Sequence, residues 1–494
     1  MFEEIKTLGK HTLIYGSGIF LGKAISFFMI PLYTHFLSPK DYGVLELLDL
    51  TGYIISYFLV LGLNEATLRY YSYYDDPKDK NAVISTNIIF ILFYASVFVF
   101  FLFNFSDTFS KHIFGSELYK PLFALLFISL LFNSVNNICT TTLRAQQRSV
   151  YYTALSITKV ILAISLNIYF VALLKLGVKG ILYSTIITSG LLGFYLIFTI
   201  LSQVKFSFQI SYLIKMLKYG LPFIPTEIAM FILNWSDRYF LRIYNTVESI
   251  GIYALAYKIA MIIVVLVTHP FNLVWAAYMF EIEKKQNSKE LYARIATYYM
   301  FVLTLIGLFL CVYAKEIITI IAPPSYLKAY KVIPLLVMSM IFMTSVAVLR
   351  TGILVTRKTS YLPIMVGLAA IINIFLNFLL IPKYEIEGAA IATAISFFVR
   401  AFGIYLISQW LYSIPFEYSR IFKLILAAII IFEISTFVSI DNLWLSIVIK
   451  SSILCLFPII LYILKFLTTE ETTFLKNRLR LLHHLVLQNS KKYF

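Results

Sequence analysis

Five charged side chains fall well inside long apolar stretches of this sequence. They are Lys23, Lys159, Glu227, Lys258 and Arg400. A charge at the centre of a bilayer costs at least about 2.5–3.5 kcal/mol, so such a residue normally faces a partner or a hydrated cavity. Four of the five are cations, and ammonium and guanidinium groups bind phosphate oxygens well. The pattern predicts a cationic cavity that binds an anionic substrate, with phosphate or diphosphate as the recognised group.

The four cations differ in how firmly they indicate a cavity. Lys23 follows a Gly-x-x-x-Gly repeat, and Arg400 shares a helical face with small and polar residues. Such neighbours are typical of an inward, hydrated face. Lys159 and Lys258 lie about two turns from the ends of their apolar stretches, so for them an extended side chain that reaches the membrane surface is an equal alternative.

Three carboxylates are candidates for ion coupling or for counter-charges. Glu227 lies one turn after Pro222 and Pro225, which predict a bent helix. Its alternative role is a structural ion pair. Glu46 and Asp49 occupy the first turns of a predicted helix, where negative charge is favourable without any further role.

A second pair of charges predicts a structural contact. Glu433 and Lys450 are equally distant from a turn at residues 441–442 that separates two apolar stretches. We expect them to form an ion pair within a helical hairpin.

Other chemistries find little support in the sequence. Cys139, Cys311 and Cys455 lie in apolar stretches without Cys-x-x-Cys spacing, which indicates packing rather than a disulfide or metal site. The acidic run at residues 75–79 occurs once and reads as a solvated turn. There is no nucleotide-binding loop or zinc spacing. We therefore expect no catalytic residue, no metal and no cofactor, and a protein that is not an enzyme.

The candidate residues must be positioned by membrane-spanning helices. Residues are 60% hydrophobic, 17% aromatic and only 13% charged, far from the balance of a soluble domain. A helix needs about 20 apolar residues to cross a bilayer. The sequence predicts an all-α polytopic membrane protein with about 14 spans, at residues 12–36, 43–63, 82–104, 118–141, 151–173, 178–201, 217–236, 251–275, 295–314, 332–349, 361–381, 388–411, 421–439 and 443–464.

The distribution of Lys and Arg predicts the orientation. They are more than twice as frequent in the two termini and the even-numbered loops as in the odd-numbered loops, which places both termini in the cytoplasm. This distribution accounts for most of the net charge of +16 without a nucleic-acid partner. The tail carries a basic amphipathic segment at residues 470–488, which we expect to lie on anionic membrane lipids unless it is only partly ordered.

Three short landmarks recur at a nearly constant distance and indicate an internal repeat. Gly43 corresponds to Gly251, Arg144 to Arg350 and Gly180 to Gly388, at offsets of 208, 206 and 208 residues. Six spans separate the copies, so they share one orientation and form two parallel bundles, an architecture suited to a midplane site and alternating access. The expected organisation is a six-helix lobe at residues 1–203, a second at 204–412, two further helices at 413–466 and the tail at 467–494.

Several local sequences resemble the polysaccharide-transporter branch of the multidrug/oligosaccharidyl-lipid/polysaccharide exporter superfamily, whose members include O-antigen repeat-unit flippases. The resemblance covers roughly residues 8–465. It is carried by Ile30 through Gly43, by Tyr219 through Pro222 followed by Asp237-Arg238, by Gly251 through Lys258, and by Asn377 through Thr393.

The resemblance implies a flippase that moves an undecaprenyl-diphosphate-linked oligosaccharide across the bacterial plasma membrane. Cationic residues of its central cavity would bind the diphosphate, and Lys23 and Lys258 match the cationic positions of the family by region. The last two spans would border a groove for the lipid tail. The implied partners are the lipid-linked oligosaccharide, membrane lipids and polysaccharide-assembly proteins.

Three alternatives remain open from the sequence. A peptidoglycan-precursor flippase shares the fourteen-span plan and differs only in its substrate. A drug/cation antiporter of the same superfamily normally uses acidic residues, whereas the deep charges here are mainly positive. A membrane polysaccharide polymerase or glycosyltransferase would normally present a large loop with catalytic groups, and none is found here.

Overall fold

The protein is a bundle of helices whose order follows the predicted spans. The computed structural model describes residues 29–204, 207–438, 440, 442–469 and 471–473, and no strand occurs among them. The helices are α2 (Pro39–Val60), α3 (Leu63–Tyr73), α4 (Pro77–Asn104), α5 (Ser106–Phe114), η1 (Glu117–Tyr119), α6 (Lys120–Ala145), α7 (Ser149–Asn167), η2 (Ile168–Leu173), α8 (Gly177–Leu201), α9 (Ile210–Gly220), α10 (Phe223–Tyr244), α11 (Val247–Ala260), η3 (Val264–Thr268), α12 (His269–Glu283), α13 (Ser288–Val312), α14 (Ala314–Ile321), η4 (Pro324–Lys331), α15 (Ile333–Leu349), α16 (Thr351–Val355), α17 (Tyr361–Leu411), α18 (Tyr418–Thr436) and α19 (Leu443–Ile463).

Within the described residues, eleven helices are long and apolar enough to cross a membrane. The protein is therefore an all-α polytopic membrane protein, as predicted, although this number is smaller than 14. Most of the first predicted span lies outside the described residues. The spans predicted at 361–381 and 388–411 form one long helix, α17, which is broken at Glu385 by non-helical φ and ψ of 49° and −124°. The remaining difference is α18, which carries three charged residues.

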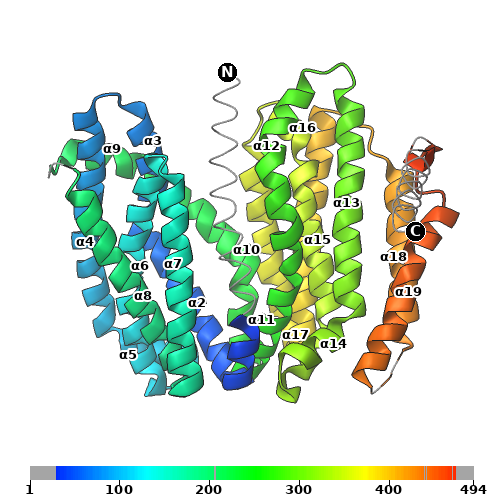
Figure 1. Cartoon of the computed structure of the whole chain (residues 1–494), viewed down its shortest axis with the longest axis horizontal. Coiled ribbons are helices and arrows are strands. Elements are labelled where there is room, and N and C mark those ends of the chain that lie inside the picture. Colours follow the sequence, from blue (N-terminus) through cyan, green and yellow to red (C-terminus); the bar gives the residue numbers. More distant parts are fainter. Residues whose placement is uncertain (1–28, 205–206, 439, 441, 470, 474–494) are drawn as a thin grey trace, which may run out of the picture.

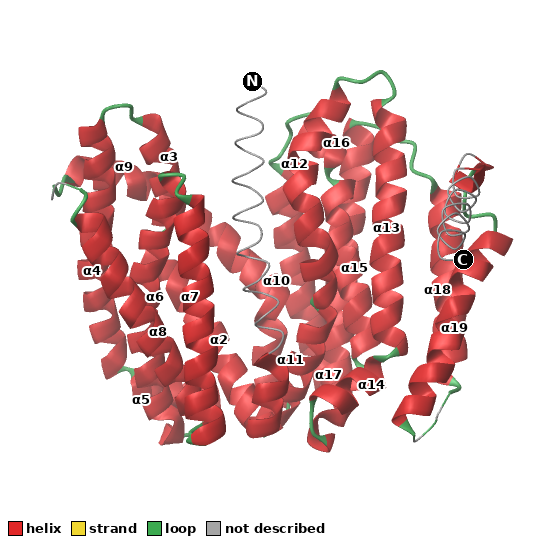
Figure 2. Ribbon diagram, viewed as in Figure 1, coloured by secondary structure: helices red, strands yellow, loops and turns green. Residues whose placement is uncertain are grey.

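The helices form two groups that stand side by side and approach each other at one end (Figure 1). In the first group α6 packs against α2, α3, α4 and α8, and α9 packs on α3 and α4. In the second group α17 packs against α10 and α15, and α13 packs against α15. We call these groups the N-terminal and C-terminal lobes. Figure 2 shows that loops are short and gather at the two ends of the helices.

The lobes meet where α2 crosses α11. The two helices begin alike: Ser38 caps α2 by accepting a 3.1 Å hydrogen bond from the backbone N–H of Asp41, and Thr246 caps α11 by accepting a 3.2 Å bond from that of Ser249. Side-chain oxygens at this position satisfy backbone N–H groups that a helix start leaves free. Since 246 lies 208 residues after 38, the two copies of the repeat fold alike here.

Gly43 and Gly251 make this crossing possible. A Cβ on Gly43 would overlap the carbonyl oxygen of Val247, and a Cβ on Gly251 would overlap that of Pro39. Gly43 thus lies against Val247, one turn before Gly251, and Gly251 lies against Pro39, one turn before Gly43. Pro39 and Val247 are 208 residues apart, as are Gly43 and Gly251. Only glycine permits this backbone contact. The crossing is a symmetric joint between equivalent helices of the two lobes.

The hairpin of α18 and α19 is attached to the outside of the C-terminal lobe (Figure 1). Buried apolar residues of both helices pack against the end of α13, among them Leu424, Ile431 and Phe457. The hairpin is therefore held by a small hydrophobic core of its own with the C-terminal lobe.

The ion pair expected between Glu433 and Lys450 is wrong. Lys450 pairs instead with Glu316 of α14, with Nζ at 2.8 and 2.9 Å from the two carboxylate oxygens, and the hydroxyl of Ser446 donates to the same carboxylate. Glu433 is exposed, on the side of α18 that faces away from Ile431 and the hydrophobic core. Equal depth in the hairpin did not place the two side chains on facing sides of their helices.

The crossing predicts an unusual response to alanine. Glycine to alanine within a helix normally stabilises by about 0.5–1 kcal/mol. At Gly251 the added methyl group meets backbone, which cannot move without separating the lobes, so we expect Gly251→Ala to lower the thermal unfolding temperature in detergent by several degrees. Gly367→Ala is the matched control, because a Cβ there meets no atom within 4 Å. A Gly251→Ala protein as stable as Gly367→Ala would contradict the backbone contact.

Candidate functional site

Charged residues gather on α2, α10 and α11 beside the crossing of the lobes. Glu46 of α2 lies between two cations: its carboxylate oxygens are 3.6 Å from Nε of Arg238 and 3.5 Å from Nζ of Lys258. Glu46 and Arg238 are buried, whereas 37% of the Lys258 side chain is exposed. Glu46 therefore connects an interior charge of the C-terminal lobe to an accessible one.

Arg238 is held by several groups of the protein, although its Nε, like that of Arg420, has no hydrogen-bond partner. Its NH1 group donates to Asp237 at 2.7 Å and to the carbonyl oxygen of Asn234 at 3.1 Å. The guanidinium also lies over the rings of Tyr257 and Tyr253, at 4.0 and 5.0 Å from their centroids. A buried charge with such partners anchors structure rather than binding a substrate.

From the sequence, Asp237 and Arg238 were noted only as part of a short motif that resembles the transporter family. The predicted span ended at residue 236, whereas α10 continues to Tyr244 and carries both residues into the interior. The sequence did contain a signal for these two residues: they are adjacent, opposite charges directly after the end of the predicted span.

Asp237 also organises buried polar groups across three helices. Its second carboxylate oxygen accepts hydrogen bonds from Tyr253 of α11 at 2.6 Å and from Thr393 of α17 at 3.3 Å. Next to it, Ser236 donates to Asn373 of α17 at 3.1 Å. The polar residues of α10, α11 and α17 thus hold the interior of the C-terminal lobe together.

Lys258 faces the accessible side of this cluster. Its Nζ donates to the hydroxyl of Tyr42 at 3.0 Å and lies over the same ring, 4.5 Å from the centroid. Asp49 is exposed one turn after Glu46 and acts electrostatically on Lys258. The described charges here are therefore two cations and three carboxylates, which differs from the strongly positive cavity that the sequence predicted.

Arg400 occupies a different environment, in the C-terminal lobe beside Arg350. Arg400 is buried, and the positive charge of Arg350 acts on it electrostatically. The Nε atoms of both residues are buried and have no hydrogen-bond partner. Within the described residues neither arginine takes part in an ion pair. Arg350 was a repeat landmark in the sequence, and its role beside Arg400 was missed because the two are 50 residues apart.

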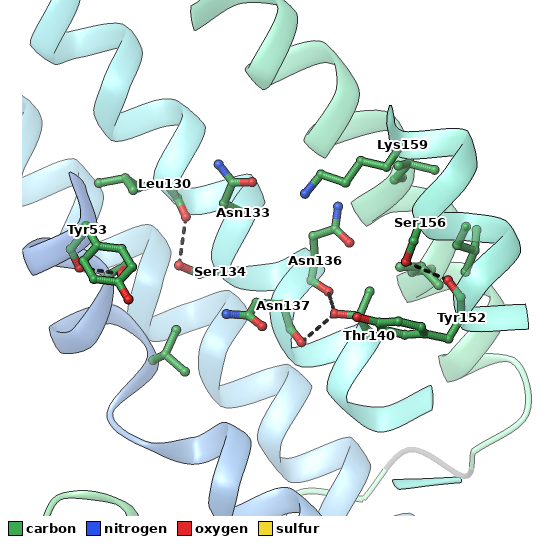
Figure 3. A pocket seen from close by; sticks show the side chains of 15 residues that line it. Tyr53, Leu130, Asn133, Ser134, Asn136, Asn137, Thr140, Tyr152, Ser156 and Lys159 are labelled. Atoms are coloured by element: carbon green, nitrogen blue, oxygen red, sulfur yellow. Dashed lines mark hydrogen bonds between the residues drawn. The ribbon is translucent and has the colours of Figure 1, made fainter. Parts of the chain in front are cut away.

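Lys159 lines a cavity of about 390 Å³ inside the N-terminal lobe. The walls come from α2, α6, α7 and α8, and Figure 3 shows the ammonium group of Lys159 directed toward Asn133 and Asn136. No carboxylate lines this cavity. Lys159 therefore extends into a cavity with a polar lining.

Lys159 and Arg400 lie on corresponding parts of the two copies of the repeat, but not at corresponding positions. At an offset of 208, Lys159 corresponds to Gly367, and Leu192, which lines the same cavity, corresponds to Arg400. Around Gly367 there is open space. Each lobe thus carries one cation on this pair of helices. In the N-terminal lobe it lies on the first helix, α7, and in the C-terminal lobe it lies on the second, the part of α17 after Glu385.

The other predicted residues have separate positions. Glu227 is exposed and accepts a 3.1 Å hydrogen bond from the hydroxyl of Tyr57, which joins α10 to α2. Pro222 lies between α9 and α10 and Pro225 in the first turn of α10, so the predicted span is interrupted at residues 221–222. Lys23 lies outside the described residues. Among the residues that are described, no group of three or more His, Cys, Asp or Glu side chains is placed to hold a metal ion.

A second cavity is entirely apolar. It has a volume of about 520 Å³ and lies between the C-terminal lobe and α19. The residues that line it come from α11 through η3, α13, α14 and α19, and they are Ile262, Leu266, Leu305, Ile306, Phe309, Leu310, Ile317, Ile320, Ile321 and Leu454. Such a surface suits a hydrocarbon chain.

Comparisons with known proteins agree with this architecture. The family model described as "Polysaccharide biosynthesis protein" matches residues 8–283. Among solved structures, lipid II flippase MurJ in an inward closed conformation matches with a TM-score of 0.73 and 18% identity, over 91% of this chain and 99% of that one.

Two further matches are transporters of related fold. An inward-facing multidrug resistance MATE family transporter of the MOP superfamily matches with a TM-score of 0.63 and 16% identity, over 81% and 95% of the two chains. A MOP superfamily transporter from Pyrococcus furiosus, described as having a binding pocket of reverse polarity, matches with a TM-score of 0.57 and 17% identity, over 84% and 96%. No curated protein sequence matches.

The anchoring role of Arg238 predicts a strong effect of removing its partner. Asp237→Asn leaves a buried guanidinium with only the more distant Glu46 as counter-charge, so we expect a loss of about 3–5 kcal/mol of stability, measured by denaturant unfolding in detergent. Asp237→Asn combined with Arg238→Met removes both charges and should recover most of that loss. Equal stability of Asp237→Asn and the wild type would show that Asp237 does not neutralise Arg238.

Proposed function

This chain belongs to the polysaccharide biosynthesis protein family, in the multidrug/oligosaccharidyl-lipid/polysaccharide exporter superfamily, and from that premise we propose which substrate it carries. It is a membrane transporter and not an enzyme. We infer that it is a flippase for undecaprenyl-diphosphate-linked oligosaccharide repeat units, the precursors of O-antigen, capsule or a related polysaccharide, in the bacterial plasma membrane.

The observation that carries this proposal is the pair Arg350 and Arg400. Two arginines of one lobe with buried Nε atoms and no ion pair among the described residues are unfavourable in a membrane protein unless an anion binds to them. Arginine matches phosphate oxygens with paired N–H donors, so a diphosphate satisfies both groups together. Lys258 is less available, because Glu46 and Tyr42 already engage it.

The apolar cavity supports a lipid-linked substrate. A polyprenyl chain gains nothing from polar contacts and needs a continuous hydrocarbon surface beside the polar path of its head group. Leu454 of α19 closes the cavity against α13 and α14. The α18–α19 hairpin thus contributes one residue to the lining.

The positions of the charged loops support an alternating-access mechanism. If both termini are cytoplasmic, the α2–α11 crossing lies at the outer end, because α2 and α11 both begin there. The lobes, proposed as residues 1–203 and 204–412 although α9 packs on the N-terminal lobe, then rock about this crossing to expose the site to either side. Residues 413–466 form the lipid-guiding hairpin. Most of the tail predicted to lie on anionic lipids, residues 474–494, lies outside the described residues. Glu46, Asp49 and Glu227 remain candidates for ion coupling or counter-charge.

A peptidoglycan-precursor flippase is the second candidate. The similarity to lipid II flippase MurJ favours this candidate, since the match covers 99% of the MurJ chain. Both candidates carry a polyprenyl diphosphate, so the arginine pair serves either, and only the glycan differs.

Translocation in liposomes tests the proposal. The reconstituted protein should accelerate the transfer of a fluorescent undecaprenyl-diphosphate oligosaccharide between leaflets. Arg400→Gln and Arg350→Gln should slow this transfer at least about tenfold, because each removes a charge-assisted contact of 1.4 kcal/mol or more. Lys358→Gln, at an exposed position of the same lobe, is the matched control.

Two results would contradict the proposal. The first is no acceleration with any lipid-linked oligosaccharide under any imposed ion gradient, which would favour a drug/cation antiporter. The second is transfer at the wild-type rate by both arginine variants. Lipid II as the substrate, at equal protein density, separates the two candidates.

A further inference from the structure

We propose that the cavity around Lys159 is a sugar-binding subsite that selects an acidic sugar, a ring with several hydroxyl groups and one carboxylate. The inference rests on the proposed function and names the part of the substrate that the N-terminal lobe recognises. A volume of about 390 Å³ lies at the lower end of the range of about 300–1,000 Å³ for small-molecule pockets. This size suits one part of a repeat unit rather than the whole.

The lining provides hydrogen-bonding groups on several sides of the cavity. Besides Lys159, the polar residues that line it are Tyr53, Ser56, Asn133, Ser134, Asn136, Asn137, Thr140, Tyr152 and Ser156. Figure 3 shows the three asparagines and Thr140 facing Tyr152, Ser156 and Lys159 across the cavity. Amides and hydroxyls match the hydroxyl groups of a sugar, which both donate and accept hydrogen bonds.

Donors gather around one point of this cavity. The amide oxygen of Asn133 accepts a 2.7 Å bond from Ser189, which leaves its NH₂ group to donate. The NH₂ group of Asn136 is buried and has no partner, and this residue is only 4% exposed. The ammonium group of Lys159 points toward both. Three donors and no carboxylate of the protein form a site for a group that only accepts, such as a carboxylate.

Acceptors lie on the hydroxyl side chains. Ser134, Thr140 and Ser156 each donate their proton to a backbone carbonyl oxygen of their own helix, at 2.8, 2.9 and 2.8 Å. Their oxygens keep lone pairs that can accept from the hydroxyl groups of a sugar. The lining thus offers acceptors as well as donors, and both are needed to bind the hydroxyl groups of a sugar.

The other copy of the repeat shows that the fold does not need this polarity. At the offset of 206 residues, Asn136, Asn137 and Thr140 correspond to Phe342, Met343 and Val346. A structural requirement of the helix packing would apply to both copies. The polar groups of the N-terminal lobe therefore serve a ligand.

A diphosphate fits this cavity less well than a single carboxylate. One ammonium group balances one negative charge, whereas the more highly charged diphosphate is better matched by the two arginines of the C-terminal lobe. A neutral sugar would leave Lys159 without a counter-charge, which is unfavourable at this depth. The substrate is thus held at two places, by its diphosphate in one lobe and by an acidic sugar in the other.

Binding of free sugars to the purified full chain in nanodiscs tests the inference. Saturation-transfer NMR titrations with sodium D-glucuronate, D-glucose and inorganic pyrophosphate compare the three chemistries. We expect glucuronate to bind at least about tenfold more tightly than glucose. Lys159→Gln should weaken glucuronate binding about tenfold or more, Lys159→Arg should restore part of it, and Lys179→Gln, an exposed lysine of the same lobe, should leave it unchanged.

A second variant guards against misfolding of Lys159→Gln. Asn136→Leu introduces the apolar character of the other lobe and should also weaken glucuronate binding, while pyrophosphate binding stays unchanged. Equal binding of glucose and glucuronate, unchanged glucuronate binding in both variants, or loss of pyrophosphate binding in Lys159→Gln would overturn the inference.

The results separate this inference from the proposed function. Arginine-dependent translocation in liposomes without glucuronate binding would overturn only the sugar subsite. Lys159-dependent glucuronate binding without any translocation would overturn the flippase and leave the acidic-sugar site in place.

Discussion

The backbone contact between α2 and α11 is the constraint on which the arrangement of this protein depends. Two helices approach this closely only where neither carries a side chain, and Gly43 and Gly251 provide that gap reciprocally. Because the contact involves equivalent residues of a duplicated unit, it is a symmetric joint. It joins the lobes at one end while their helices remain separate groups toward the other (Figure 1).

The joint also sets the electrostatics of the interior. Glu46 lies about one turn beyond Gly43, and Lys258 two turns beyond Gly251, so the crossing itself brings these two charges together. Arg238, fixed by Asp237, completes the cluster from α10. These charges are largely neutralised by each other. Among the described residues, Arg350 and Arg400 of the C-terminal lobe and Lys159 of the N-terminal lobe take part in no ion pair.

Duplication followed by divergence explains why the two lobes have different residues at equivalent interior positions. Equivalent positions hold the same caps and the same glycines, where the backbone path depends on them. The cavity positions have changed: asparagines and a threonine in the N-terminal lobe correspond to apolar residues in the C-terminal lobe, and a leucine corresponds to Arg400. A substrate with a diphosphate, an acidic sugar and a hydrocarbon chain would use all three surfaces of the molecule.

Much of the fold was predictable because it depends on periodic and local features. The lengths of the apolar stretches predicted the helices, and the constant offsets predicted the repeat. In the structure, the equivalent caps and glycines show that repeat. Pairings between distant helices were not predictable in this way. Lys450 pairs with Glu316 rather than with Glu433. Which side chains face each other depends on the rotation of each helix about its own axis, and not only on depth in the membrane. The electrostatic effect of Arg350 on Arg400 joins residues 50 positions apart and could not be predicted from either stretch alone. Asp237 and Arg238 were not predicted to be buried because the predicted span ended before them, whereas α10 continues to Tyr244.

The most direct test of this account is the movement of the lobes about the α2–α11 joint. Spin labels on Tyr73 and Lys358 report the distance between the lobes at the end away from the joint, and labels on Leu118 and Tyr384 report it at the joint end. We predict that double electron–electron resonance will show opposite changes when lipid-linked substrate is added, with the first distance shorter and the second longer. Two distances that stay constant, or that change in the same direction, would contradict a joint that rocks.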